Sequence, residues 1–210
     1  AQEKRYVSDW KQESHHLDIT VADKHTDERK NYRLDLTGMY QIKNILTVLE
    51  AVHQLRLQGW HISDEALMHG LANTKKITGL HGRWEIVHQH PTVVLDVAHN
   101  EDGIKQVVAQ LELCNYHQLH IITGFVKDKE IEKILRLLPA TAQYYFTQAY
   151  MPRALEAESL QQKAESFGLG GKSFSNVNLA VKEALQHAHL NDLILICGSV
   201  FLVGEVDINF

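Results

Sequence analysis

The hydrophobic pattern of the N-terminal third of the chain predicts strands followed by two helices. Residues 17–21 alternate apolar and polar side chains, which is typical of a half-exposed strand, and residues 32–36 are a candidate second strand. Between residues 40 and 59, apolar side chains recur at the 3.6-residue period of a helix. A second, shorter helix is expected to begin after Ser63, a typical N-cap residue, and to end near residue 72.

The pattern then changes to strands that alternate with helices. Strands are predicted over residues 84–88, 92–97, 119–125, 143–147, 172–174 and 193–197, and helices over residues 101–113, 128–138, 155–167 and 177–189. Such alternation indicates βαβ units. Continuous apolar runs at residues 93–95 and 193–196 are typical of strands that are buried on both faces. The expected fold class is therefore α/β, with a Rossmann-like, mostly parallel sheet and helices on both faces.

A polar, glycine-containing segment at residues 73–82 separates the two patterns and is interpreted as a linker. The predicted domains are residues 1–78 and residues 79–210. The charged start of the chain is interpreted as the solvated edge of a sheet that begins before residue 1. The chain is therefore expected to be a piece of a longer protein.

Composition narrows the class of protein. The 210 residues are 44% hydrophobic and 22% charged, as in ordinary soluble globular chains. A net charge of −5 argues against a nucleic-acid or anionic-lipid partner. No apolar run is long enough to span a membrane, and no signal peptide is recognisable. Cys114 and Cys197 lie in apolar stretches, as expected of buried thiols in a reducing, cytoplasmic compartment.

The candidate chemistry follows the strands, because ligands of parallel α/β sheets bind beyond the carboxyl ends of the strands. Asp96 has a carboxylate suited to ribose hydroxyls, and the His99 imidazole suits an anion. The alternative is that Asp96 only orders the turn and Asn100 only caps the next helix. Ser199 either helps to bind an anion or only caps a helix. Arg83 either clamps a phosphate or is a surface linker residue.

Three other kinds of site are not supported by the sequence. Residues 168–173 look like the end of a phosphate-binding P-loop, but Ser166 stands where the pattern needs glycine. This segment also follows a predicted helix rather than a strand, so Gly168 is interpreted as a helix C-cap. The fourteen histidines are scattered and lack metal-ligand spacing, so no metal site is predicted. A G-x-S-x-G nucleophile signature is also missing.

Six segments occur in a fixed order along the chain. They are GMYQIKN at residues 38–44, GRWE at 82–85, DVAHN at 96–100, GFVKDKE at 124–130, PRA at 152–154 and CGSVFLVGEV at 197–206. Together they resemble the C-terminal half of folylpolyglutamate synthase/dihydrofolate synthase, a branch of the Mur ligase superfamily. The resemblance covers residues 34–206, and it implies a Mur-ligase C-terminal domain preceded by the tail of a central ATPase domain.

The resemblance also implies an activity. Members of this family are ATP-dependent ligases that add L-glutamate to folate or dihydropteroate through an acyl phosphate, with ATP and Mg²⁺ bound by a monomeric enzyme. The P-loop, the magnesium ligands and the carbamylated lysine of the family would lie upstream of this chain. No catalytic set is therefore complete here, and the chain alone is expected to be inactive.

The same resemblance implies binding roles for six residues. Gln41 and Asn44 would lie near the adenine of ATP, Asp96 at the ribose and Arg83 at the phosphates. The incoming glutamate would be bound by His99 and Ser199.

Departures from the family pattern include Tyr40 in place of a frequent histidine and His81 in place of a common proline. Two alternatives stay open, a Mur ligase acting on a peptidoglycan precursor and a non-catalytic α/β binding module. The Gly82-Arg83 spacing and the segment from Cys197 to Glu205 favour the folate branch. The sequence does not separate dihydrofolate synthesis from polyglutamate extension.

Overall fold

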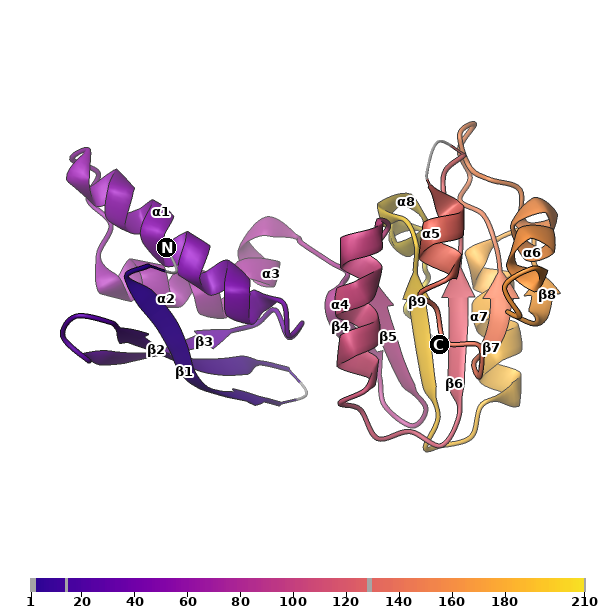
Figure 1. The fold of residues 1–210 in the computed structure, drawn as a ribbon, viewed down its shortest axis with the longest axis horizontal. Coiled ribbons are helices and arrows are strands. Elements are labelled where there is room, and N and C mark those ends of the chain that lie inside the picture. The colour runs from indigo at the N-terminus through magenta and orange to yellow at the C-terminus, as the bar shows by residue number, and fades with distance from the viewer. Residues whose placement is uncertain (1–2, 14, 128–129, 210) are drawn as a thin grey trace. The chain divides into compact units, whose positions relative to one another are not determined.

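The computed structural model describes residues 3–13, 15–127 and 130–209. The chain divides into two compact units, Ala1–Leu80 and His81–Phe210, and each unit is described by itself (Figure 1). The division falls within the segment interpreted as a linker, close to the expected boundary after residue 78.

The first unit packs two helices against a three-stranded antiparallel sheet of order β1-β2-β3 (Figure 1). Its elements are β1 (Arg5–Gln12), β2 (Leu17–Asp23), β3 (Arg29–Leu34), α1 (Gln41–Leu57), α2 (Asp64–Ala72) and α3 (Thr74–Thr78). The alternation in β2 buries Leu17 and Ile19 against apolar residues of α1 such as Ile45. Ser63 caps α2 as predicted, because its hydroxyl accepts a hydrogen bond from Ala66 N at 3.1 Å.

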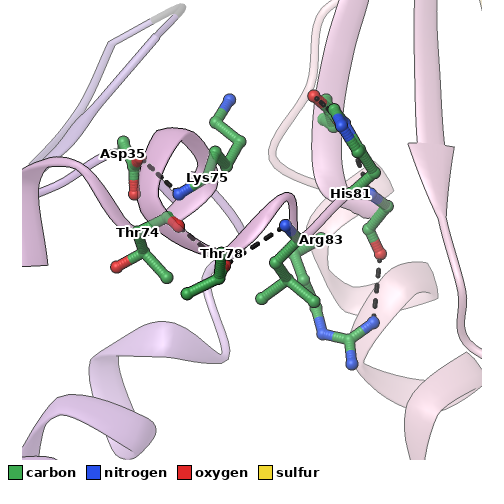
Figure 2. Close-up of polar contacts among 9 residues, drawn as sticks. Asp35, Thr74, Lys75, Thr78, His81 and Arg83 are labelled. Atoms are coloured by element: carbon green, nitrogen blue, oxygen red, sulfur yellow. Dashed lines mark hydrogen bonds and ion pairs between the residues drawn. The ribbon is translucent and has the colours of Figure 1, made fainter.

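Two elements of this unit differ from the prediction. β1 was not predicted, because most of its side chains are exposed and the strand shows no buried apolar alternation. α3 lies inside the segment interpreted as a linker. Its turns are held by side chains rather than by an apolar face: Asp35 Oδ2 accepts from Lys75 N at 2.8 Å, and Thr78 Oγ1 donates to Thr74 O at 2.7 Å (Figure 2). The predicted polar linker is therefore wrong over this helix.

The second unit is a six-stranded sheet with helices on both faces, which confirms the predicted α/β class. Its elements are β4 (Arg83–His88), β5 (Thr92–Asp96), α4 (Glu101–Leu111), β6 (Leu119–Thr123), α5 (Ile131–Leu135), β7 (Gln143–Phe146), α6 (Ala157–Glu165), β8 (Gly171–Ser173), α7 (Val177–His187), β9 (Leu193–Cys197) and α8 (Val200–Gly204). The helix predicted over residues 128–138 is the shorter α5, and Asp128 and Lys129 lie outside the described residues.

The strand order of this sheet is β4-β5-β9-β6-β7-β8 (Figure 1). β4 is antiparallel to β5, whereas β5, β9, β6, β7 and β8 run parallel. Buried side chains of α4, α5 and α6 pack on one face of the sheet, and those of α7 and α8 pack on the other. Because β4 is antiparallel, its first residue, Arg83, lies at the carboxyl edge of the parallel strands, opposite Asp96.

Both cysteines are free among the described residues, as the sequence predicted. Cys197 is fully buried, and this burial raises the pKa of its thiol to about 12. Cys114 is only partly buried, and the pKa of its thiol is also raised by burial. No helix of the described part is both long and apolar enough to cross a bilayer.

A buried polar cluster lies at the amino edge of this sheet. His120 on β6 is 4% exposed, and its Nδ1 lies 3.0 Å from the Tyr145 hydroxyl. Its Nε2 lies 3.5 Å from Oδ2 of the buried Asp192. Burial lowers the pKa of His120, and it outweighs the opposing attraction of Asp192. The folded state therefore favours the neutral imidazole.

We expect this histidine to make folding less stable in acid. Below the unfolded-state pKa of about 6.5, the unfolded chain binds a proton at His120 more readily than the folded chain does. The free energy of unfolding therefore falls by up to about 1.4 kcal/mol for each unit that the pH is lowered. The test is urea unfolding from pH 8 to pH 5.5, followed by Trp84 fluorescence with Trp10 and Trp60 replaced by phenylalanine. His120→Gln should flatten the acid side of the profile, and equal slopes for both proteins would contradict the prediction.

Candidate functional site

A β-bulge lies where β4 begins. The register moves from Arg83 opposite Asp96 to Glu85 opposite Leu95, so Trp84 is the extra residue. Trp84 has a φ of +52°, which is uncommon for a residue with a side chain, and its indole is buried in the core. Bulges bend a strand and re-aim the neighbouring side chains. This bulge therefore sets the direction from which Arg83 leaves the sheet edge.

Asp96 ties this bulge to the loop after β5. Its side chain is 2% exposed, Oδ2 accepts from Trp84 N at 2.9 Å, and Oδ1 accepts from Ala98 N at 2.9 Å. Of the two roles that the sequence left open, the ordering of the turn is thus present. The ribose contact stays a prediction.

The loop after β5 presents His99 and caps α4. His99 is partly exposed, and its Nδ1 lies 2.9 Å from Val97 O. Because a carbonyl oxygen only accepts, Nδ1 is assigned as the protonated nitrogen that donates this hydrogen bond. Nε2 is then the atom left for a ligand: it accepts from an ammonium when neutral and donates to a carboxylate when protonated. Asn100 Oδ1 accepts from Gly103 N at 2.8 Å, so the predicted cap of α4 is confirmed.

The turn after β9 joins the same edge. Gly198 N donates to Ala98 O at 2.9 Å, which links this turn to the loop that carries His99. Ser199 is 7% exposed, and its Oγ accepts from Phe201 N at 3.2 Å, so it caps α8. The hydroxyl proton of Ser199 can still donate to a ligand. Four of the predicted site residues, Arg83, Asp96, His99 and Ser199, therefore lie at the carboxyl edge of one sheet.

Two basic residues at this edge received no role from the sequence. Lys127 follows β6 and Arg153 follows β7, and Lys127 N donates to Arg153 O at 2.9 Å. A short antiparallel bridge between Val126 and Ala154 joins the two loops. Both basic side chains are exposed. The signal was available, since each residue is basic and follows a predicted strand of the sheet.

The remaining two predicted residues, Gln41 and Asn44, lie in the first turn of α1 in the first unit. Asn44 Nδ2 donates to Gln41 Oε1 at 2.9 Å, and the Gln41 side chain is buried. The two amides border a cavity of about 350 Å³. Its other walls are mostly apolar side chains of β3, α1 and α2, including Leu34, Ile45 and Leu71. Such a cavity suits a flat aromatic ring with polar edges.

Neither a P-loop nor a metal centre is built by the described part of the chain. Gly168, at a φ of +75°, ends the turn after α6, and the segment leads into β8 rather than into a helix. No group of three or more His, Cys, Asp or Glu side chains among the described residues could hold a metal ion. No step on this chain is therefore assigned to a metal ion.

A family model for the Mur ligase, glutamate ligase domain matches residues 82–200. This range contains the bulge, the loops after β5, β6 and β7, and the turn after β9. It leaves out the first unit with Gln41 and Asn44.

Three proteins are similar to this chain over most of its length. A probable bifunctional folylpolyglutamate synthase/dihydropteroate synthase of Haloferax volcanii is 30% identical over 191 residues, which is 90% of this chain and 22% of that protein. E. coli FolC in complex with DHPP and ADP has a TM-score of 0.71 at 29% identity, over 92% of this chain and 43% of that one. A bifunctional folylpolyglutamate synthase/dihydrofolate synthase with Mn, AMPPNP and L-glutamate bound has a TM-score of 0.69 at 25% identity, over 92% and 44%. The chain spans less than half the length of each.

Proposed function

Because this chain belongs to the Mur ligase family through its glutamate ligase domain, we propose that it forms part of an ATP-dependent ligase that joins L-glutamate to a folate or dihydropteroate carboxylate. In this reaction the γ-phosphoryl group of ATP moves to the carboxylate and ADP leaves. The glutamate amine then attacks the acyl phosphate, inorganic phosphate leaves, and an amide bond forms. The observation that carries the proposal is the gathering of Arg83, Asp96, His99 and Ser199 at one sheet edge.

Arg83 is proposed to bind the phosphates of ATP. A guanidinium is permanently charged and matches phosphate oxygens with paired N–H donors. Its backbone is fixed by the bulge at Trp84, so less backbone freedom has to be lost on binding. Lys127 and Arg153 add positive charge to the same edge, where a transferring phosphoryl group and a substrate carboxylate both carry negative charge.

Adenine binding is proposed for Gln41 and Asn44, two residues of the first unit. The amides of Gln41 and Asn44 border the apolar cavity of the first unit, and amides pair with the ring nitrogens and amino group of adenine. Asp96 is proposed to accept from ribose hydroxyls. ADP or AMPPNP in the solved relatives supports a nucleotide as ligand of this family.

Glutamate is proposed to contact His99 and Ser199. His99 Nε2 can accept from the substrate ammonium or, when protonated, donate to a carboxylate, and the Ser199 hydroxyl can donate to a carboxylate oxygen. The relative with L-glutamate bound supports this substrate class.

The test uses the full-length gene product that contains this chain, with Mg-ATP and radiolabelled glutamate. Dihydropteroate and tetrahydrofolate serve as acceptors, and a muramoyl nucleotide serves as control. Label on a pterin acceptor supports the proposal and shows which of the two activities is present. Label only on the muramoyl acceptor would assign the chain to the peptidoglycan branch. No label on any acceptor would favour the non-catalytic binding module.

A substitution at His99 tests the assigned substrate. His99→Ala is expected to raise the glutamate KM about tenfold, the loss of one charge-assisted hydrogen bond, and to change the ATP KM less than about twofold. His187→Ala is the control, because His187 ends α7 and lies outside the loops that form the proposed site. It should change neither the glutamate KM nor the ATP KM. An unchanged glutamate KM together with a collapse of ATP binding would overturn the assignment of His99.

A further inference from the structure

Glu85 is the third residue of β4 and has no part in the function proposed above. Its side chain is only 11% exposed. Oε2 accepts from Gly82 N at 2.9 Å, and both carboxylate oxygens lie 3.2 Å from His81 Nδ1. A carboxylate this close to a phosphate-binding residue would repel phosphate, unless neighbouring hydrogen-bond donors offset its negative charge. Here the carboxylate is engaged by His81 and by the Gly82 N–H, from the two residues that precede Arg83.

Gly82 occupies a position that the surrounding chain restricts. Its φ is +72°, and a Cβ at this position would lie 2.6 Å from Val97 Cγ1. The Gly82 carbonyl accepts from Val97 N at 2.9 Å and from Arg83 Nη1 at 3.3 Å. The Gly82 N–H donates to the Glu85 carboxylate. Glycine is the most flexible residue, so each contact that fixes its backbone matters.

Arg83 therefore lies between two anchored backbone positions. On one side Glu85 holds the Gly82 N–H, and on the other Asp96 holds the N–H of Trp84. Trp84 keeps a φ of +52°, which costs on the order of 1 kcal/mol and persists only where neighbours enforce it. With both flanking peptides fixed, the guanidinium starts from one backbone geometry and not from many. Fixed geometry is what gives a positioned charge its effect on a bound or reacting group.

We propose that Glu85 is a positioning residue for Arg83: by holding the Gly82 N–H, its carboxylate fixes the turn from which the guanidinium reaches the nucleotide phosphate. This inference rests on the proposed role of Arg83 in ATP binding. Glutamine keeps an oxygen that accepts the Gly82 N–H, whereas leucine removes it and retains a similar bulk. The two substitutions therefore separate the hydrogen bond from the space that the side chain fills.

The first measurement is structural and needs no activity. In ¹⁵N-labelled protein, the Gly82 amide should exchange with solvent at least about tenfold faster in Glu85→Leu than in the native chain, because one intramolecular hydrogen bond is lost. Glu85→Gln should restore most of the protection. Unchanged Gly82 exchange in Glu85→Leu would overturn the proposal.

The second measurement is kinetic and uses the full-length gene product. Glu85→Leu should raise the ATP KM roughly five- to tenfold and change the glutamate KM less than about twofold, and Glu85→Gln should stay within about twofold of the native enzyme. Glu132→Leu, on the exposed side of α5, controls for the loss of one negative charge and should behave as native.

The outcomes separate this proposal from the function on which it rests. If Arg83→Ala raises the ATP KM and Glu85→Leu does not, the positioning role is wrong while ATP binding by Arg83 stands. If Glu85→Gln is as impaired as Glu85→Leu, the hydrogen bond to Gly82 is not the cause, and the positioning role is also wrong. If Arg83→Ala leaves the ATP KM unchanged, the proposed phosphate contact itself fails.

Discussion

Arg83→Ala is expected to lower kcat/KM for ATP by about 100-fold, or about 2.7 kcal/mol, in the full-length gene product. Removing one preorganised donor to developing charge commonly costs 10²–10³-fold. The bulge at Trp84 and the anchored Gly82 fix the backbone of Arg83, which gives its guanidinium the preorganisation that this estimate assumes. Arg83→Lys should recover only part of the loss, to about tenfold below native, because an ammonium cannot bind two phosphate oxygens as a fork.

The measurement is initial rate against ATP concentration at saturating glutamate and acceptor. Arg136→Ala is the matched control, since Arg136 stacks over the Phe167 ring at 5.2 Å and has no proposed contact with substrate. It should stay within about twofold of native. Equal kcat/KM values for Arg83→Ala and Arg136→Ala would remove Arg83 from the phosphate site.

Gly198→Ala is expected to destabilise the second unit by about 3 kcal/mol and to abolish ligase activity. The φ of Gly198 is +115°, and a Cβ there would lie 2.5 Å from the Gly124 carbonyl oxygen and 2.8 Å from Thr123 Oγ1. The first of these is backbone of the neighbouring loop and cannot rotate away. Backbone strain and overpacking each cost about 1–3 kcal/mol. Relief would pull the turn after β9 away from Ala98 and so displace both Ser199 and His99.

Urea unfolding followed by Trp84 fluorescence, with Trp10 and Trp60 replaced by phenylalanine, measures this loss. Gly170→Ala is the control, because a Cβ at Gly170 would meet no atom within 4 Å. It should change the unfolding free energy by less than about 1 kcal/mol. A native-like midpoint for Gly198→Ala would show that the close approach of the two loops is not required.

The fold was largely predictable because its second unit follows simple rules. Continuous apolar runs in β5 and β9 indicated strands buried on both faces, and amphipathic segments between strands indicated helices. β1 and α3 were missed for the opposite reason. Most side chains of β1 are exposed, and α3 is held by Asp35 and threonine hydroxyls, which leave no hydrophobic period to detect.

The candidate site was predictable as a set of residue types but not as a geometry. Strand-end position identified Asp96, His99 and Ser199, and the resemblance to the ligase family added roles that stay predictions. The sequence offered Asp96 as a residue that orders the turn after β5, but it did not indicate the second bond, from Trp84 N, because that bond depends on the positive φ of Trp84. Glu85 was equally hidden, since its hydrogen bond to Gly82 exists only once the turn has formed.

The place of β9 has a consequence for biosynthesis. This strand lies between β5 and β6 in the sheet, yet it comes after every other strand in chain order. A nascent chain still on the ribosome would hold β5 and β6 with their facing edges unpaired until β9 has left the exit tunnel. Unpaired apolar edges are sites of aggregation, so the interval before β9 emerges is the time at which this unit most needs a chaperone. Slower translation of codons just before Leu193 would lengthen that interval and lower the soluble yield.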